Sequence, residues 1–482
     1  MKKKLRIRKI ISNGESMTKE DWIKFTQIKS IEDLEKFANR YNKGELSFQT
    51  KQAEISFLYN LGLWYSEYYE ETELEKLIFR KEDKYYLPVY FYLKAIKIYE
   101  DNKLTIDNDE NFLYEIVRRL YVNIANEYSN QFRTISALAY YRKALKIDNF
   151  FDMAIGNFAI GIEHHSPLLG LDESKYSLIF NFLYELYFDL HLDNLDSGKE
   201  FFANKKLQYK NKQLCYFNSI VNGINANYNP YDFFTEIDID CELYDNWCVK
   251  NTLYLNYIND LGDYEEVKFD IDLHKLNEIL KLSDAQLHSL NNLFELFALQ
   301  RKKIFECKSL SNREELYELA QVFQCLYSYF DKVAFFLFKY FHLTGKEHTV
   351  NINRIWDMKD EDGNSLMKYK NQYLYNIYWL RKEYRENTKD TLKINELLSP
   401  DAQDYADIRN TLEHKEFSFT QIEGLPYLNP DLLYRKTIKL AGVVRNMILS
   451  LVQMLDVERR LIDKETNKRN FDLVYFSYQG FM

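Results

Sequence analysis

The sequence REELYELAQVFQCLYSYFDKVAFFLFKYF, at residues 313–341, decides the fold class of this 482-residue chain. Its apolar residues recur at intervals of three and four: Leu316, Leu319, Val322, Phe323, Leu326, Phe330, Val333, Ala334, Leu337 and Phe341. This spacing places them on one face of an α-helix, because an α-helix turns once every 3.6 residues. The stretch therefore predicts one long amphipathic helix that packs against other helices.

Similar patterns predict further long helices, at about 284–306, 364–386, 399–416 and 430–460. Ser399-Pro400 marks a helix start, because serine caps a helix and proline is tolerated at its first position. The chain has only 14 glycines and 6 prolines, which are the residues that hairpins and tight turns require. We therefore expect an all-α protein whose C-terminal half is an up-and-down helical bundle.

A second pattern lies upstream, at residues 118–151. Small and aromatic residues occur there at the spacing of a tetratricopeptide (TPR) repeat: Ala125, Tyr128, Ala137, Tyr141 and Ala144. Ala159 follows Ala125 by 34 residues, which is the period of this repeat, and Leu61-Gly62 indicates another unit further upstream. Small side chains allow two antiparallel helices to approach closely. The pattern predicts TPR-like helical hairpins, with an irregular helical bundle as the alternative.

The length of the chain predicts more than one domain, because a single hydrophobic core stops growing at roughly 250–300 residues. We expect an N-terminal segment at 1–50 and TPR-like helical repeats at 51–170. An irregular helical connector is expected at 171–271. The helical bundle and a C-terminal tail are expected at 272–482.

Composition limits the possible partners and locations. A net charge of −9 argues against a protein that coats nucleic acid, so any contact with RNA must be local. The five cysteines form no CxxC pair, which favours reduced thiols over disulfides or metal ligands. Lys339 and Arg445 interrupt the longest apolar runs, and no apolar stretch of signal-peptide length follows the basic N-terminus. We expect a cytoplasmic protein that does not contact membranes.

Polar residues interrupt the apolar pattern on the predicted helix at 399–416, where Arg409 begins the sequence RNTLEH. Asn410 and His414 are four residues apart and therefore share one face of the helix. The side chain of Arg409 is long enough to reach the same surface. His414 lies in the last turn of the helix, because residues 417–420 have an extended pattern.

This RNTLEH sequence, placed within a bundle of long helices, resembles the signature of the HEPN domain superfamily. The resemblance covers residues of about 272–460. It implies a metal-independent endoribonuclease of the kind found in bacterial toxin, phage-defence and CRISPR systems. It also implies a homodimer that pairs two such motifs, an RNA substrate such as tRNA or mRNA, and products with 2′,3′-cyclic phosphate and 5′-hydroxyl ends. No metal or other cofactor is implied.

The residue types of the motif suit this chemistry. His414 can transfer a proton near neutral pH, Arg409 can contact a phosphate through two hydrogen bonds, and Asn410 can orient either group. A track of lysines, arginines and tyrosines in the last helices suits a strand of RNA, and equally a solvated face with buried tyrosines. Further, weaker candidates for substrate binding are Lys415, Arg381, Arg385 and Asp331.

The same residues allow other interpretations. Arg409, Glu413 and Lys415 fit a solvated helix face with charge pairing between residues four apart. A pair between Glu413 and Arg409 would reduce catalysis. The main alternative to the enzyme is an adaptor, in which the repeats bind a protein or peptide partner and the bundle only dimerises. We expect the enzyme, as a toxin or phage-defence effector regulated through its N-terminal repeats.

Overall fold

The computed structural model describes residues 25, 28, 30–73, 83–102, 104, 112–148, 151–165, 241–260, 268–369, 371–384 and 398–467. Within these residues the chain forms helices and a few isolated β-bridges, and no strand. The prediction of an all-α protein is therefore confirmed. The predicted connector at 171–271 lies outside the described residues except for 241–260 and 268–271.

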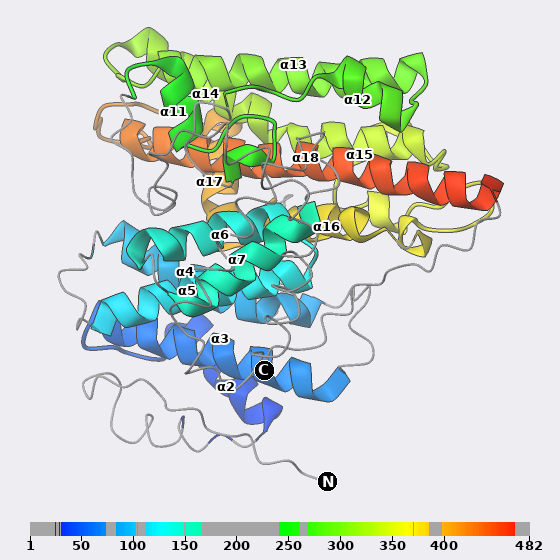
Figure 1. Ribbon diagram of the computed structural model, residues 1–482. Helices are drawn as coiled ribbons and strands as arrows, with labels where there is room; N and C mark the ends of the chain where they lie inside the picture. The colour runs from blue at the N-terminus through cyan, green and yellow to red at the C-terminus, as the bar shows by residue number, and fades with distance from the viewer. Residues whose placement is uncertain are drawn as a thin grey trace, which may run out of the picture.

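The N-terminal helices form two packed hairpins with a helix at either end (Figure 1). They are α2 (Ile31–Asn42), α3 (Lys51–Glu73), α4 (Leu87–Asp101), α5 (Phe112–Asn130), α6 (Thr134–Ile147) and α7 (Asp152–His165). Helix α3 packs along α4, and α5 packs along α6. Contacts between α4 and α5 join the two hairpins, and α7 continues the stack from α6.

The paired helices approach closely where the sequence has small residues. A Cβ atom at Gly62 of α3 would lie 2.5 Å from the Tyr92 ring of α4, so a larger residue requires a shift of the ring. Ala125, Ala137 and Ala144 of the second hairpin are 1% exposed or less. The pattern of small residues therefore marks buried contacts between helices. The assignment of these hairpins to the TPR class stays a prediction.

The C-terminal helices form a bundle around one long helix. They are α11 (Tyr244–Lys250), α12 (Leu273–Leu280), α13 (Asp284–Glu306), α14 (Arg313–Tyr327), α15 (Tyr329–Tyr340), α16 (Gln372–Leu380), α17 (Pro400–His414) and α18 (Pro430–Asn467). Helices α13, α14, α15 and α16 all pack against α18. The stretch Pro430–Leu461 is long and apolar enough to cross a membrane, but 78% of its apolar window is buried inside the fold. Helix α18 is therefore the core helix of the bundle.

Two of the predicted long helices are shorter in the structure. The single helix predicted at 313–341 ends at Ser328, whose hydroxyl donates to the Cys325 carbonyl at 2.7 Å, and a second helix follows. Such a bond between a serine side chain and the preceding turn favours a bend in a helix. The prediction of a helix at 364–386 is wrong over its first turns. Helix α16 begins only at Gln372, because Asn371 caps it by accepting from the amides of Tyr373 and Leu374.

A buried ion pair anchors the middle of α18. Arg445 is 1% exposed, and its Nη2 lies 2.8 Å from Oδ2 of Asp260, which is 2% exposed. The same guanidinium donates to the carbonyls of Tyr254, at 2.5 Å, and Asn256. A charge without water needs such partners, because desolvation costs several kcal/mol per ion. The only charged residue in the apolar run of 440–455 therefore binds the segment at 254–260 to the bundle.

A second set of charges joins the N-terminal hairpins to the bundle at α17. Lys97 of α4 lies 2.5 Å from Asp404 of α17, and Lys439 of α18 lies 2.6 Å from Glu100 of α4. Lys436 of α18 contacts both carboxylates in the first turns of α17. We call this set the ionic clamp, and its members are Lys97, Glu100, Asp401, Asp404, Lys436 and Lys439. It holds α17 between α4 and α18.

The charges of the ionic clamp set the pKa values of its acids. Burial raises the pKa of Asp401, but Lys439 and Lys436 outweigh burial and bring it below the ordinary value. Burial also raises the pKa of Glu100, and Lys143 and Lys439 again bring it below the ordinary value. Since the folded pKa values are lower than the unfolded ones, these acids stabilise the protein above about pH 4. That stability is lost as the pH falls through the folded pKa values.

Replacing Arg445 by alanine is expected to lower the free energy of unfolding by about 3–5 kcal/mol, because Asp260 stays buried without its arginine partner. Urea unfolding followed by circular dichroism measures the change. Arg435→Ala, at an exposed position of the same helix, is the matched control, with an expected change below about 0.5 kcal/mol. Equal effects of the two substitutions would show that the ion pair does not anchor α18.

Replacing Lys439 by methionine is expected to lower the free energy of unfolding at pH 7 by about 1 kcal/mol, because the partly exposed network loses one cation. The difference from wild type is expected to shrink below about pH 4, where Asp401 and Glu100 become protonated. Urea unfolding at pH 7 and below about pH 4 measures the difference in the free energy of unfolding. Lys346→Met, at an exposed position, is the control. A difference that stays constant on acidification would contradict the assigned role of the clamp.

Candidate functional site

Helix α17 begins and ends as the sequence predicts. Ser399 caps it, with its hydroxyl accepting from the Asp401 amide, and Pro400 occupies the first helical position. His414 is the last helical residue, and the amide of Lys415 donates to the Thr411 carbonyl at 3.3 Å. The helix packs against α14, α18 and α4. The RNTLEH motif therefore lies at the end of α17 that is opposite to the ionic clamp.

Arg409, Glu413 and His414 come together at this end of the helix. Nη2 of Arg409 lies 2.6 Å from Oε2 of Glu413, and Nε2 of His414 lies 3.6 Å from the same oxygen. The side chains of Arg409 and Glu413 are 27% and 31% exposed, and that of His414 is 61% exposed. One carboxylate thus stands between a guanidinium and a solvent-accessible imidazole. The predicted pair between Glu413 and Arg409 is confirmed.

The other residues predicted for the motif surround this group. Asn410 follows Arg409 and is half-buried, and Lys415 is exposed at the end of the helix. The guanidinium of Arg409 lies over the ring of Tyr327 in α14, with 5.8 Å from Cζ to the ring centroid. This position of the ring limits where the guanidinium can move.

Asp331 is connected to Arg409 through two aromatic rings. Its Oδ2 accepts a long hydrogen bond of 3.5 Å from the Tyr384 hydroxyl, and the Tyr384 ring lies 4.7 Å from the Tyr327 ring. Its Oδ1 accepts from the amide of Ile352 at 3.3 Å. These contacts fix the aromatic layer beneath the guanidinium. Asp331 is therefore bonded to the aromatic residues next to Arg409, and its contact with substrate stays a prediction.

The two predicted arginines lie after α16. Arg381, in the short helix η10 (Arg381–Glu383), is half-buried and donates to the Tyr378 hydroxyl at 2.8 Å, with its Cζ 4.3 Å from the centre of that ring. Arg385 lies outside the described residues. The structure thus gives Arg381 a packing role on Tyr378 and leaves a contact with substrate untested.

The track of basic and aromatic residues in the last helices has buried tyrosines, whereas its basic residues are partly buried and partly exposed. Lys382, Lys436 and Arg445 are 5% exposed or less, and the last two bind carboxylates. Three other basic residues of the track are exposed: Lys368, Arg435 and Lys439. The tyrosines of this track that are less than 9% exposed are Tyr373, Tyr375, Tyr378 and Tyr384. Buried side chains cannot bind an RNA strand, so the tyrosines fit the second interpretation, a solvated face with buried tyrosines. A contact between RNA and the exposed basic residues stays a prediction.

The described residues form no metal site, and two of their cysteines are buried. No group of three or more His, Cys, Asp or Glu side chains there could hold a metal ion. Cys248 and Cys307 are buried free thiols, and burial raises their pKa values to about 12 and about 11. Such thiols stay protonated at neutral pH and are poor nucleophiles.

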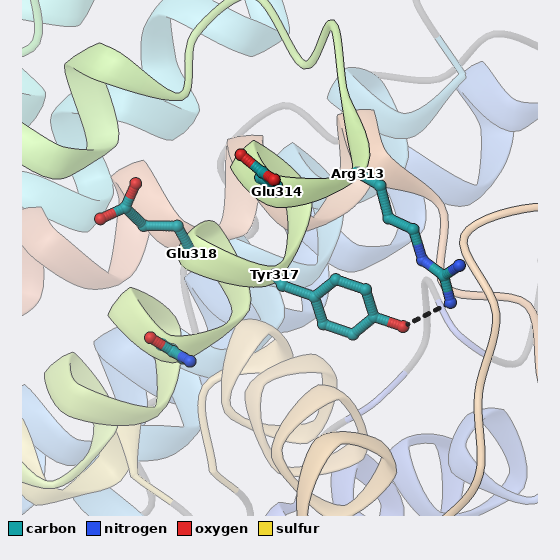
Figure 2. A pocket seen from close by; sticks show the side chains of 5 residues that line it. Arg313, Glu314, Tyr317 and Glu318 are labelled. Carbon is teal, nitrogen blue, oxygen red and sulfur yellow. Dashed lines mark hydrogen bonds between the residues drawn. The ribbon is translucent and has the colours of Figure 1, made fainter.

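One surface feature beside α17 has no counterpart in the sequence prediction. An open hollow of about 480 Å³ is lined by Arg313, Glu314, Tyr317, Glu318 and Gln321, at the start of α14 (Figure 2). The ring of Tyr317 contacts Phe417 and Phe419, in the segment that follows His414. The sequence analysis described that segment only as extended. The signal that it contains is a pair of phenylalanines, Phe417 and Phe419, that begins three residues after His414.

Comparison with known proteins identifies the C-terminal helices. Residues 295–458 match the family model described as LA2681-like HEPN. No curated protein matches the chain, and no solved structure matches it. The matched region begins within α13, ends within α18 and contains Arg409 and His414. Residues 295–458 of this chain are therefore a HEPN-family domain of the LA2681-like kind.

Proposed function

We propose that the HEPN-family domain is a metal-independent endoribonuclease. In this proposal Arg409, Asn410 and His414 cleave tRNA or mRNA and leave 2′,3′-cyclic phosphate and 5′-hydroxyl ends. The enzyme would act in the cytoplasm as a toxin or phage-defence effector. The toxin and defence roles rest on the resemblance to the HEPN superfamily, since a fold by itself does not assign a biological role.

The observation that carries the proposal is the position of the Glu413 carboxylate. One of its oxygens lies 2.6 Å from the Arg409 guanidinium and 3.6 Å from the His414 imidazole. A place that accepts an anionic oxygen between these two groups has the charge and hydrogen-bond donors that a phosphate oxygen needs. The imidazole is also open to solvent, so a chain of RNA can reach it.

The chemistry needs two proton-transferring groups and a positive charge. One His414 imidazole accepts the proton of the 2′-hydroxyl while its oxygen forms a bond to phosphorus. The bond from phosphorus to the 5′-oxygen then breaks, and a protonated imidazole gives its proton to that oxygen. Arg409 stabilises the negative charge on the phosphorane. Because one chain supplies one such histidine, we propose a homodimer in which the second copy supplies the other.

The ionic clamp suggests how the N-terminal hairpins could act on the site. Lys97 and Glu100 of α4 bind charged groups on α17 and α18, and α17 carries the motif at its other end. A protein or peptide that binds the hairpins and moves α4 would therefore pull on the helix that positions Arg409 and His414. We propose this as the route of regulation.

A non-catalytic adaptor is the second candidate, and one observation favours it. Glu413 already neutralises Arg409, so the guanidinium has less charge to offer a phosphate. In the adaptor the hairpins hold a protein partner and the bundle only dimerises. Cleavage assays separate the two candidates.

His414→Ala and Arg409→Ala are each expected to reduce RNA cleavage by roughly 10²–10⁴-fold, because each removes a group that acts in the transition state. The assay incubates the purified full chain with tRNA or mRNA in the presence of EDTA. The chemical ends of the RNA products are then determined. His348→Ala removes another exposed histidine and is expected to leave the rate unchanged. If the wild-type chain cuts no RNA, or if both variants cut at the wild-type rate, the enzyme is excluded and the adaptor stands.

Glu413→Gln is expected to lower the Kd for RNA roughly two- to five-fold, because a phosphate no longer competes with a carboxylate for a partly exposed guanidinium. Fluorescence anisotropy with a labelled oligoribonucleotide measures the change. Glu416→Gln removes a nearby exposed charge and controls for the change in net charge. An unchanged Kd together with slower cleavage would instead show that Glu413 orients the imidazole of His414.

A further inference from the structure

Three aromatic rings form a surface next to the motif, and we call them the aromatic shelf: Tyr317, Phe417 and Phe419. The ring of Tyr317 lies 5.4 Å from that of Phe419 and 6.2 Å from that of Phe417. The two phenylalanine rings lie 5.3 Å apart, edge to face. Tyr317 is 40% exposed, and both phenylalanines are only half-buried. The shelf therefore leaves aromatic surface in contact with water.

Backbone hydrogen bonds hold the segment that carries the two phenylalanines. The amide of Ser418 donates to the Pro426 carbonyl at 3.0 Å, and the amide of Leu428 donates to the Ser418 carbonyl at 2.9 Å. These bonds close the turn that connects α17 to α18. Because these bonds hold Ser418, the half-buried rings of Phe417 and Phe419 on either side of it stay next to Tyr317.

The shelf lies within reach of the motif. Phe417 follows His414 by three residues, and three residues span at most ~10 Å. The exposed Lys415 lies between them. An RNA strand with its scissile phosphate at His414 therefore has its neighbouring nucleotides close to the shelf.

The charges around the shelf favour bases over phosphates. Arg313 donates to the Tyr317 hydroxyl at 3.2 Å (Figure 2). The Cζ atom of Arg313 lies 5.4 Å from the centroid of the Tyr317 ring. Glu318 is paired with Lys303 at 2.9 Å, whereas Glu314 adds a negative charge to the hollow. A surface of mixed charge with exposed rings gives little attraction for a phosphate chain. It does suit the flat, uncharged faces of nucleobases, which stack on aromatic side chains.

We propose that the aromatic shelf is a base-stacking subsite for unpaired nucleotides that flank the scissile phosphate. This inference rests on the proposed ribonuclease function and adds the substrate class, which is single-stranded RNA. Bases within a duplex are already stacked and paired, whereas those of loops and ends are free to stack on protein rings. The shelf therefore selects loops and single strands over duplexes, with little preference for base identity.

The test compares shelf variants with abasic RNA. Tyr317→Leu and Phe419→Leu are each expected to raise the KM for a single-stranded oligoribonucleotide roughly 5- to 100-fold, because each removes a stacking partner for a base. Phe335→Leu, at a ring of α15 that is also 40% exposed, is the matched control and is expected to behave as wild type. An RNA that is abasic at the stacked nucleotide is expected to bind wild type weakly and to lose no further affinity with Tyr317→Leu.

The outcomes separate this inference from the proposed function. If wild type cuts RNA but neither the abasic RNA nor the variants change KM, the shelf is not a subsite and the ribonuclease stands. If wild type binds single-stranded RNA without cutting it, loss of binding in the variants supports the shelf while the ribonuclease fails. A third outcome is that light scattering shows the variants as monomers and wild type as a dimer, while wild type binds abasic and intact RNA equally. In that case the shelf is a contact between copies of the chain, and the proposal is overturned.

Discussion

The attachment of α17 by charge is the interaction on which the rest of the site depends. Asp401 and Asp404 in its first turns are held by lysines from two different helices, one in the hairpins and one in the bundle. The two halves of the protein thus share one short helix. Because an α-helix is stiff over four turns, the position of its first turn also fixes that of Arg409 and His414 at its end.

At the other end of α17 lies a second group of charged side chains, of which the His414 imidazole is the most exposed. Glu413 bridges the arginine and the histidine, while the rings of Tyr327 and Tyr384 support the guanidinium from below. This arrangement keeps a strong cation in a fixed place with an anion that is easily displaced.

Much of the helical architecture could be predicted from the sequence. The predicted helix at 284–306 agrees with the bounds of α13, and Ser399-Pro400 marks the start of α17. The predictions failed where a single side chain changes the course of the backbone. Ser328 ends α14 through its bond to the preceding turn, and the apolar periodicity continues through this break without any sign of it. The domain boundaries and the TPR class of the hairpins remain predictions.

The sequence alone determined the all-α class, the amphipathic faces and the presence of Arg409, Asn410 and His414 on one helix, because these follow from residue spacing within a single turn or two. The tertiary structure decided which charges are buried and which are free. Lys97 and Asp404 are far apart in the chain. By its sequence Arg445 is as available for RNA as any other cation of its helix, but in the fold it is buried against Asp260. The same applies to the aromatic shelf, which joins Tyr317 to the residues after the motif. Partners of this kind depend on how helices pack, and the pattern within each helix contains no information about its neighbours.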